Sequence, residues 1–262
     1  MHYFYLFIIN YFYIIMTQKT LVLYVFHEYT SLVQNFIDKC LFQSPIVDFL
    51  FIAHGFKEKL NLPRYVSILY KEKNEGYDFS AWSYGLLINN KYENYENFIF
   101  VNSTVYGPFI NNQFQGKWTD IFINRLTNDI KLFGCTINTK IKFLTDSHVQ
   151  SYLFSMKKDT LKLLIKNNIF SLNIKDHYLY HDDVINNKEI KMSRIVIDNG
   201  GNIGCLYKFY NGIDFRKKDN FPFEYFRLNS MNADDIMFPE YLNVAWTLDE
   251  VVFIKGNRFD IK

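Results

Sequence analysis

Short apolar runs alternate with helix-type patterns through the N-terminal half of the chain, and this alternation most constrains the fold. Residues 98–101 form an apolar run with aromatic side chains, which is typical of a strand buried on both faces. Strands that alternate with helices form a mainly parallel, doubly wound sheet flanked by helices, so we predict an α/β fold. The predicted elements are strand 21–26, helix 31–41, strand 47–53, strand 65–70, a helix after Asp78 and strand 98–101.

Polar side chains follow two of these strands at the point where each strand ends. Asn102 and Ser103 come directly after the last strand, and Asn74, Gly76 and Asp78 follow the strand before it. Open α/β sheets bind ligands at the carboxyl ends of their strands, and a glycine lets the backbone approach a ligand closely. Taken singly, Asp78 reads as a helix N-cap and Asn102 as a turn former. The repeated layout favours a binding site.

Two histidines extend the same edge of the predicted sheet. His27 and His54 end the first two strands. Because the carboxyl ends of parallel strands meet at one edge, we expect both to lie near Asn74, Asp78 and Asn102. The N-terminal half therefore predicts a single cleft.

Composition excludes several classes of protein. The chain has 262 residues, of which 49% are hydrophobic and 19% aromatic, so a disordered chain is excluded. The formal charge is only +2 and the basic residues are scattered, which argues against a nucleic-acid partner. Cys40, Cys135 and Cys205 are odd in number and lie in apolar surroundings, as expected for buried thiols in a reducing compartment. We therefore expect a cytoplasmic location.

Residues 1–16 are almost wholly aromatic and aliphatic. A spanning helix needs about 20 apolar residues, and a cleaved signal peptide needs a basic start and small residues at its cleavage site. The segment is shorter than a spanning helix, and it lacks the basic start and the small residues of a cleaved signal peptide. Two interpretations remain, a membrane anchor and an accessory extension. We favour the extension, with a single domain over residues 17–262.

The C-terminal half is predicted to continue the same alternation. No internal repeat or low-complexity linker divides it. The predicted elements are helix 118–126, strands 131–137 and 141–144, a helix from Asp159, helix 187–199, strand 204–209 and an apolar segment at 251–254.

Several ordered blocks resemble the rhamnan-synthesis F-like glycosyltransferases of bacteria, eukaryotes and large viruses. The first block is Asn74-x-Gly76-x-Asp78 followed by an aromatic helix, the second is residues 100–109, and the third is residues 147–151. The resemblance implies a GT-A-like fold, a nucleotide-sugar donor, and transfer of a hexosyl or deoxyhexosyl group to a glycan or glycoprotein acceptor. Further matching blocks are residues 118–119, 132–138, Glu189 with 193–194, and 250–258.

The resemblance also implies a divalent cation, and here the chain departs from the family pattern. Many bacterial relatives carry Asp directly after the strand-end Asn, where this chain has Ser103. Mn²⁺ and Mg²⁺ prefer carboxylate oxygen, so the departure weakens the predicted cation site. Asp78 and Asn102 remain as its predicted ligands.

The resemblance assigns roles to residues at several points of the chain. His148 and Gln150 are expected to contact the sugar or the acceptor, and the alternative for His148 is a hydrogen-bonded structural histidine. Lys255 and Arg258 are expected to neutralise the departing diphosphate. The predicted donor-binding residues are His27, Asn74, Gly76, Asp78, Asn102, Ser103, Lys255 and Arg258.

Glu189 is the predicted catalytic base. It matches the acidic position of a family block and falls in the first turn of the helix predicted over residues 187–199. The alternative interpretation is a charge that stabilises the helix N-terminus. Asp182 and Asp183 are the other candidates for the base. If turnover has been lost, the chain is instead a non-catalytic nucleotide- or sugar-binding protein with the same fold.

Overall fold

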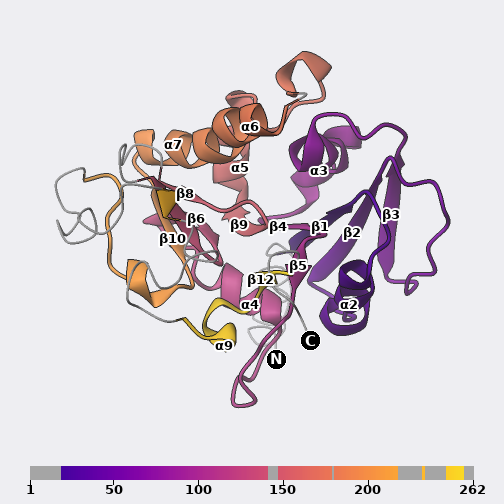
Figure 1. The fold of residues 1–262 in the computed structure, drawn as a ribbon, viewed down its shortest axis with the longest axis horizontal. Coiled ribbons are helices and arrows are strands. Elements are labelled where there is room, and N and C mark those ends of the chain that lie inside the picture. The colour runs from indigo at the N-terminus through magenta and orange to yellow at the C-terminus, as the bar shows by residue number, and fades with distance from the viewer. Residues whose placement is uncertain (1–18, 141–146, 179, 218–231, 234–245, 257–262) are drawn as a thin grey trace, which may run out of the picture.

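The centre of the computed structural model is a seven-stranded sheet with the strand order β10-β6-β9-β4-β1-β2-β3 (Figure 1). The structure describes residues 19–140, 147–178, 180–217, 232–233 and 246–256. Paired strands run parallel except β9, which is antiparallel to β4 and β6. The strands of this sheet are β1 (Thr20–Phe26), β2 (Val47–His54), β3 (Val66–Lys71), β4 (Asn97–Asn102), β6 (Ile130–Gly134), β9 (Leu153–Lys157) and β10 (Asn202–Cys205).

Two smaller sheets complete the strands that the structure describes. One has the order β11-β7-β8, and the other pairs β12 with β5. Their strands are β5 (Val105–Tyr106), β7 (Ile137–Lys140), β8 (His148–Val149), β11 (Asn232–Ala233) and β12 (Ile254–Lys255).

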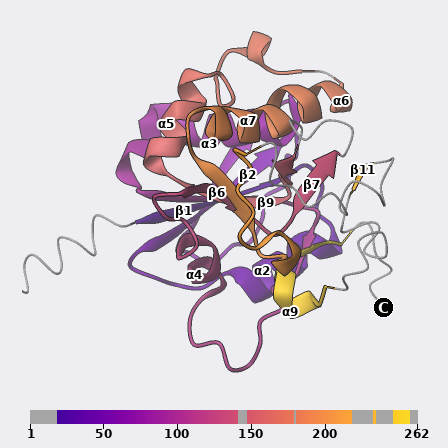
Figure 2. The same ribbon diagram turned by 90° about the vertical axis from the view of Figure 1, so that its left-hand side faces the viewer.

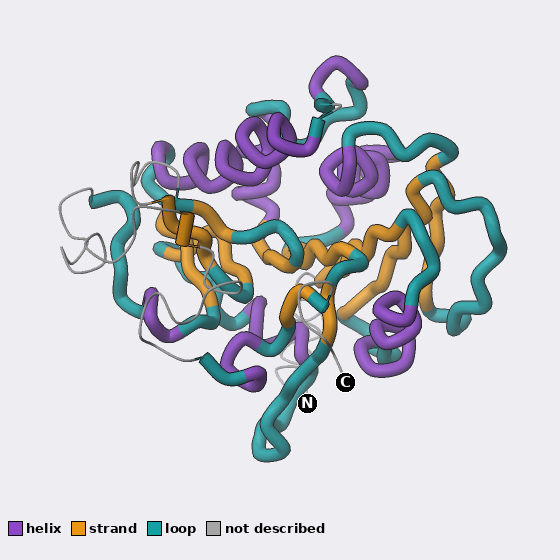
Figure 3. Tube along the Cα trace, viewed as in Figure 1, coloured by secondary structure: helices purple, strands orange, loops and turns teal. Residues whose placement is uncertain are grey.

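Helices cover both faces of the central sheet, as Figures 2 and 3 show. On one face α3, α5 and α7 pack over the strands, and on the other face lie α2 and α4. The predicted α/β class with a mainly parallel, doubly wound sheet is therefore confirmed. The helices are α2 (Ser31–Cys40), α3 (Tyr77–Leu87), η1 (Ile88–Asn94), α4 (Trp118–Ile123), α5 (Lys158–Lys166), η3 (Ile174–Asp176), α6 (His181–Val184), the π-helical turn η4 (Ile185–Ile190), α7 (Lys191–Asp198), η5 (Lys208–Tyr210) and α9 (Leu248–Val251).

Each face of the sheet has its own aromatic core. Trp82 of α3 packs edge-on against Phe100 of β4 and Phe154 of β9, and the rings of these two phenylalanines are stacked 4.7 Å apart. On the opposite face Tyr24 stacks on Phe36 of α2 at 4.1 Å. Every residue of β1 is buried, because this strand lies in the middle of the sheet with a helical layer on either side.

The register of the strands places several polar residues at one edge. Val25 of β1 pairs with Asn102 of β4, and His54 of β2 pairs with Lys71 of β3. The strand β1 has β4 on one side and β2 on the other, so the chain order reverses there. In open α/β sheets such a switch point opens a crevice beyond the carboxyl ends of the strands.

The antiparallel strand β9 brings a second set of residues to this edge. Because β9 runs against β4, its amino end lies beside the carboxyl end of β4. The backbone N–H of Asn102 donates to the carbonyl oxygen of Tyr152 at 3.1 Å. The residues before β9 therefore reach the strand-end Asn102 from the other half of the chain.

The C-terminal half differs from the predicted elements in several places. The predicted strand 131–137 is wrong as one element, because β6 ends at Gly134 and β7 joins a different sheet. Strand β10 ends at Cys205, and the 3₁₀-helix η5 follows where the strand was expected to continue. Only part of the apolar segment 251–254 is extended, since Val251 ends α9. The predicted strand 141–144 lies outside the described residues, as do residues 1–16.

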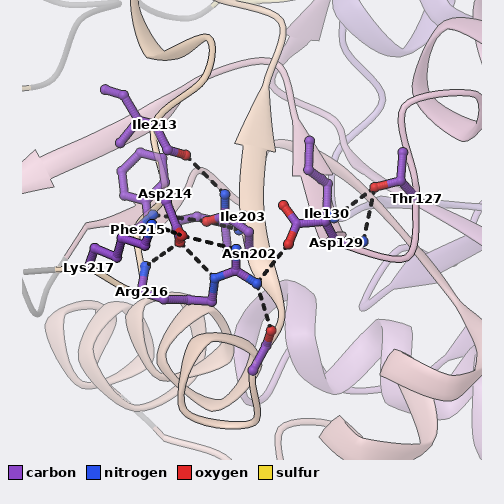
Figure 4. Close-up of polar contacts among 11 residues, drawn as sticks. Thr127, Asp129, Ile130, Asn202, Ile203, Ile213, Asp214, Phe215, Arg216 and Lys217 are labelled. Atoms are coloured by element: carbon purple, nitrogen blue, oxygen red, sulfur yellow. Dashed lines mark hydrogen bonds and ion pairs between the residues drawn. The ribbon is translucent and has the colours of Figure 1, made fainter. Parts of the chain in front are cut away.

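Arg216 fixes the segment that follows β10 (Figure 4). Its guanidinium donates to both carboxylate oxygens of Asp214, at 2.7 and 3.0 Å, and to the carbonyl oxygen of Gly200 at 3.0 Å. It also lies 2.7 Å from Asp129, just before β6. The amide of Asn202 donates to the carbonyl oxygen of Ile213 at 2.9 Å. These contacts attach residues 213–216 to the edge of the sheet.

The three cysteines are free and buried, as predicted. Within the described residues, no helix combines the length and the apolar character that a membrane span requires.

Candidate active site

A cleft with a volume of about 680 Å³ lies at the carboxyl edge of the sheet, within the usual size range of ligand pockets. One wall is formed by the ends of β1, β2 and β4 and the start of α3. The other is formed by residues around β8 and by the helical run from α6 to η4. The predicted site residues among its lining are His27, Asn74, Asp78, Asn102, Ser103, His148, Gln150, Glu189 and Lys255.

Two predicted site residues lie outside the lining, and a third is not described. Gly76 is buried and lies just before α3, outside the lining. Asp183 is exposed on α6 and is also outside the lining, whereas its neighbour Asp182 lines the cleft. Arg258 lies outside the described residues.

The two strand-end segments meet through a hydrogen bond. The side-chain amide of Asn102 donates to the Asp78 carboxylate at 3.0 Å. The amide oxygen of Asn102 in turn accepts hydrogen bonds from the backbone N–H and the hydroxyl of Thr104, at 3.1 and 2.6 Å. Burial raises the pKa of Asp78, and the Asn102 hydrogen bond partly offsets this rise. The negative charge of Glu189 across the cleft acts in the same direction as burial.

The entry into α3 is set by two consecutive residues in the left-handed region, Gly76 with a φ of 78° and Tyr77 with a φ of 53°. Gly76 is the N-cap residue, so the interpretation of Asp78 as the cap is wrong. The sharp turn leaves Asp78 in the first helical turn, with its carboxylate facing Asn102 instead of the helix backbone. Left-handed backbone at a non-glycine residue is uncommon and concentrates at functional sites.

Glu189 lies in the π-helical turn η4 in the middle of a continuous helical run from His181 to Asp198. The prediction that it occupies a first turn is therefore wrong, and so is its interpretation as a charge at a helix N-terminus. Asn187 resembles a capping residue in the sequence, but its side chain donates to the carbonyl oxygen of Asp183 at 3.0 Å inside the run. π-helical turns occur frequently at functional sites.

The Glu189 carboxylate is held on both sides by the segment around β8. One oxygen accepts the backbone N–H of Ser151 at 2.5 Å, and the other lies 3.9 Å from Nε2 of the buried His148. Ser193 and Arg194 bind the same segment, through Val149 N–H at 3.1 Å and the carbonyl oxygen of Ser147 at 2.6 Å. The helical run thus contacts alternate residues of the segment 147–151, which fixes the carboxylate in the cleft.

Lys255 reaches the cleft through the pairing of β12 with β5. Lys255 pairs with Val105, and the backbone N–H of Gly256 donates to the carbonyl oxygen of Thr104 at 2.7 Å. The Lys255 ammonium lies 5.7 Å from the centre of the Tyr152 ring. A cation is therefore held next to the Asn102–Thr104 turn by a segment distant in sequence.

The chain also matches a known protein family. The family model described as rhamnan synthesis protein F matches residues 54–229, about two thirds of the chain. The chain belongs to the rhamnan synthesis protein F family. This is a glycosyltransferase family, so the predicted family is confirmed. No curated protein matches the chain significantly.

Solved structures similar to this family member are also glycosyltransferases. The mannosyltransferase PcManGT from Pyrobaculum calidifontis, in complex with GDP-Man and Mn²⁺, is 9% identical with a TM-score of 0.43. The match covers 72% of this chain and 55% of PcManGT, so this chain spans about half of that protein. A glycosyltransferase involved in the glycosylation of the major capsid of PBCV-1 is 14% identical, with a TM-score of 0.34 over 71% of this chain and 80% of that one. The bifunctional glycosyltransferase WbbM is 10% identical, with a TM-score of 0.35 over 66% of this chain and 37% of WbbM.

The described residues of this rhamnan synthesis protein F member do not form a complete cation cage. Asp78 offers one carboxylate, but the amide oxygen of Asn102 is already used by Thr104, and Ser103 offers only a hydroxyl. Within the described ranges, no group of three or more His, Cys, Asp or Glu side chains is arranged to hold a metal ion. A divalent cation would need oxygen ligands from the bound diphosphate as well as from Asp78.

His54 organises the loop that leads to Asp78, a role that the sequence did not indicate. It lines the cleft, is almost fully buried, and its Nε2 lies 3.2 Å from the Lys71 ammonium. Lys71 also donates to the carbonyl oxygen of Lys73 at 2.9 Å. Burial, together with the positive charge of Lys71, lowers the pKa of His54 to about 4. His54 is therefore a neutral acceptor for Lys71 near neutral pH.

We expect the free energy of unfolding to fall as the pH drops from about 6.5 to 4. In this window the unfolded chain protonates His54 and the folded chain does not, so folding becomes less favourable by up to about 3 kcal/mol. Urea unfolding of the wild type and of His54→Gln at pH 7 and pH 5 measures the effect. The variant should show a smaller loss, and His181→Gln, which alters an exposed histidine, should keep the wild-type loss. Equal losses in all three proteins would contradict the assignment.

Asn138 is a second cleft residue that the sequence did not indicate as part of the site. It lies on β7 directly opposite His148 of β8. Nearby, the hydroxyl of Thr136 donates to the side-chain oxygen of Gln150 at 2.7 Å. The predicted strand 131–137 stopped one residue before Asn138, and the change of sheet at β7 that brings Asn138 to the cleft was not visible in the sequence.

Proposed function

We propose that this glycosyltransferase moves a hexosyl or deoxyhexosyl group from a nucleoside diphosphate sugar to a glycan or glycoprotein acceptor. The observation that carries the proposal is one cleft with a polar donor wall around Asp78 and Asn102 and a fixed carboxylate, Glu189, on the opposite wall. Its volume of about 680 Å³ suits a nucleotide sugar.

In this proposal one wall of the cleft binds the donor, and the other wall carries the base that acts on the acceptor. In the proposed reaction Glu189 takes the proton of the acceptor hydroxyl while the hydroxyl oxygen bonds to the anomeric carbon. The bond from that carbon to the diphosphate breaks, and its electron pair leaves with the nucleoside diphosphate. Lys255 is placed beside the Asn102–Thr104 turn to stabilise the charge that develops there. His27, Asn74 and Ser103 complete the proposed donor wall.

A divalent cation, Mn²⁺ or Mg²⁺, would be held by Asp78 together with diphosphate oxygens and would neutralise the leaving group. We also propose a cytoplasmic location, which three buried free thiols support.

A donor screen tests the function. The full chain is incubated with UDP-, GDP- and dTDP-sugars in the presence of Mn²⁺ or Mg²⁺, and release of the nucleoside diphosphate is followed. Release with one donor, above the rate of Glu189→Gln, supports transfer. If a nucleotide sugar raises the melting temperature but no donor is turned over, the non-catalytic binding protein becomes the better description. The presence of Ser103 at the family's Asp position is the observation that favours this second candidate.

Asp78→Asn is expected to weaken nucleotide-sugar binding by roughly 10- to 100-fold without loss of folding, because a charge-assisted contact is removed. The amide of Asn102 still finds an oxygen at position 78, and the cost of a buried charge disappears. Calorimetric titration with and without EDTA separates two roles. A loss that EDTA abolishes assigns Asp78 to a cation, and a loss that persists assigns it to the nucleotide itself. Unchanged affinity in both conditions would contradict both roles.

A further inference from the structure

Asn138 has a side-chain oxygen that no described group satisfies. This oxygen is shielded from water and accepts no hydrogen bond from the part of the chain that the structure describes. A buried acceptor without a donor destabilises the protein, and native structures contain few of them. Asn138 nevertheless lines the cleft, so a bound molecule can reach its amide group.

The position of Asn138 places it close to the proposed reaction centre. In the antiparallel pair of β7 and β8, Asn138 faces His148 directly, and side chains of directly opposed residues lie on the same face. His148 is in turn 3.9 Å from the Glu189 carboxylate. The strand pairing and this distance connect Asn138, His148 and the proposed base as a row of neighbouring residues in the lining of the cleft.

From this row we infer that Asn138 binds a hydroxyl group of a neutral sugar, an inference that rests on the proposed function. An unsatisfied amide oxygen requires a hydrogen-bond donor, and rotation of the amide about its terminal bond exchanges the oxygen with the nitrogen at the cleft surface. A sugar hydroxyl both donates and accepts, so it can pair with whichever end of the amide faces the cleft. The Glu189 carboxylate lines the same cleft and disfavours a sugar that carries its own negative charge.

The hydroxyl belongs either to the sugar of the donor or to the acceptor saccharide, and the two sources predict different results. The test compares the wild type with Asn138→Ala, in which no orphan oxygen remains, and with Asn138→Asp, which keeps acceptor oxygens. For each protein the melting temperature is measured, together with the affinities for GDP-mannose, UDP-glucose and dTDP-rhamnose and for the corresponding nucleoside diphosphates.

Asn138→Ala is expected to retain or raise the melting temperature and to weaken binding of the accepted nucleotide sugar by about five- to tenfold, with no change for its nucleoside diphosphate. That result assigns the hydroxyl to the donor sugar. If the affinity for the nucleotide sugar is unchanged and the KM for a saccharide acceptor rises by the same factor, the hydroxyl belongs to the acceptor. Asn138→Asp should show the smaller loss in either case.

Thr119→Val supplies the matched control. The hydroxyl of Thr119 is also buried without a partner, but it lies on α4, away from the cleft. Its removal should maintain or raise the melting temperature and leave sugar binding unchanged. Equal binding and equal KM values for the wild type and Asn138→Ala would overturn the inference while leaving the proposed function intact. A wild type that neither binds nor turns over any nucleotide sugar would overturn the proposed function and the inference with it.

Discussion

Glu189→Gln is expected to reduce glycosyl transfer by about 10²- to 10⁴-fold, the range typical of a lost general base. The amide keeps the shape of the side chain and an oxygen that can accept the N–H of Ser151, so the cleft should remain folded. It cannot take a proton from the acceptor hydroxyl. The effect is measured as initial rates at saturating donor. An equal melting temperature of the wild-type and variant proteins shows that both are folded.

The matched controls for this prediction are two other acidic residues of the same helical run. Asp182 lines the cleft at its exposed rim, whereas Asp183 is outside the lining. Asp182→Asn and Asp183→Asn should each retain most of the wild-type rate. Full activity of Glu189→Gln, combined with a large loss in one of the aspartate variants, would move the base to that aspartate.

Donor binding should separate from turnover in Glu189→Gln. The carboxylate belongs to the other wall of the cleft from Asn102, so the variant should bind a nucleotide sugar about as tightly as the wild type. Burial is the main cause of the raised pKa of Asp78 and the negative charge of Glu189 adds to it, so removal of that charge should bring the pKa closer to its ordinary value. A variant that lost both binding and turnover would indicate a role in holding the cleft together.

The parallel part of the sheet was predictable because burial on both faces leaves a simple trace in the sequence. The apolar runs at β1 and β4 are continuous and that at β2 is interrupted only by Asp48, so each strand was located to within about two residues. The convergence of His27, Asn102 and Asp78 on one edge follows from parallel pairing alone. The contact between the Asn102 amide and the Asp78 carboxylate is more specific than the pattern could predict.

The second wall of the cleft was harder to predict because it depends on long-range contacts. No local sequence pattern marks the π-helical turn at Glu189. Asn187 is misleading in the sequence, because asparagine is a common N-cap residue. The close approach of β8 depends on Gly134, where a Cβ atom would lie 2.4 Å from a side-chain carbon of Val149. Hydrophobic periodicity cannot predict such a contact, because the two residues are 15 positions apart in the chain.

Gly76→Ala is expected to abolish donor binding and to destabilise the fold, the second large effect. A Cβ atom at this position would lie 2.6 Å from Cβ of His177 and 2.8 Å from Cβ of Ser80, atoms that cannot move without their backbones. The φ of 78° adds roughly 1–2 kcal/mol of backbone strain for any other residue, and overpacking typically costs about 1–3 kcal/mol more. Relief of the clash would shift the Tyr77–Asp78 turn and with it the carboxylate that Asn102 holds.

Gly212→Ala isolates the steric part of this effect. Gly212 has the same φ of 78°, but no atom lies within 4 Å of a Cβ built there. The control variant should therefore lose only the backbone contribution, measured by urea unfolding, and should bind a nucleotide sugar as the wild type does. If both variants were destabilised equally and both kept donor binding, the close approach of Gly76 to His177 would have no part in forming the site. A selective loss in Gly76→Ala instead makes the packing of the 171–178 segment against this glycine a condition for placing Asp78, because displacement of a binding group by about 1 Å can cost 10²-fold.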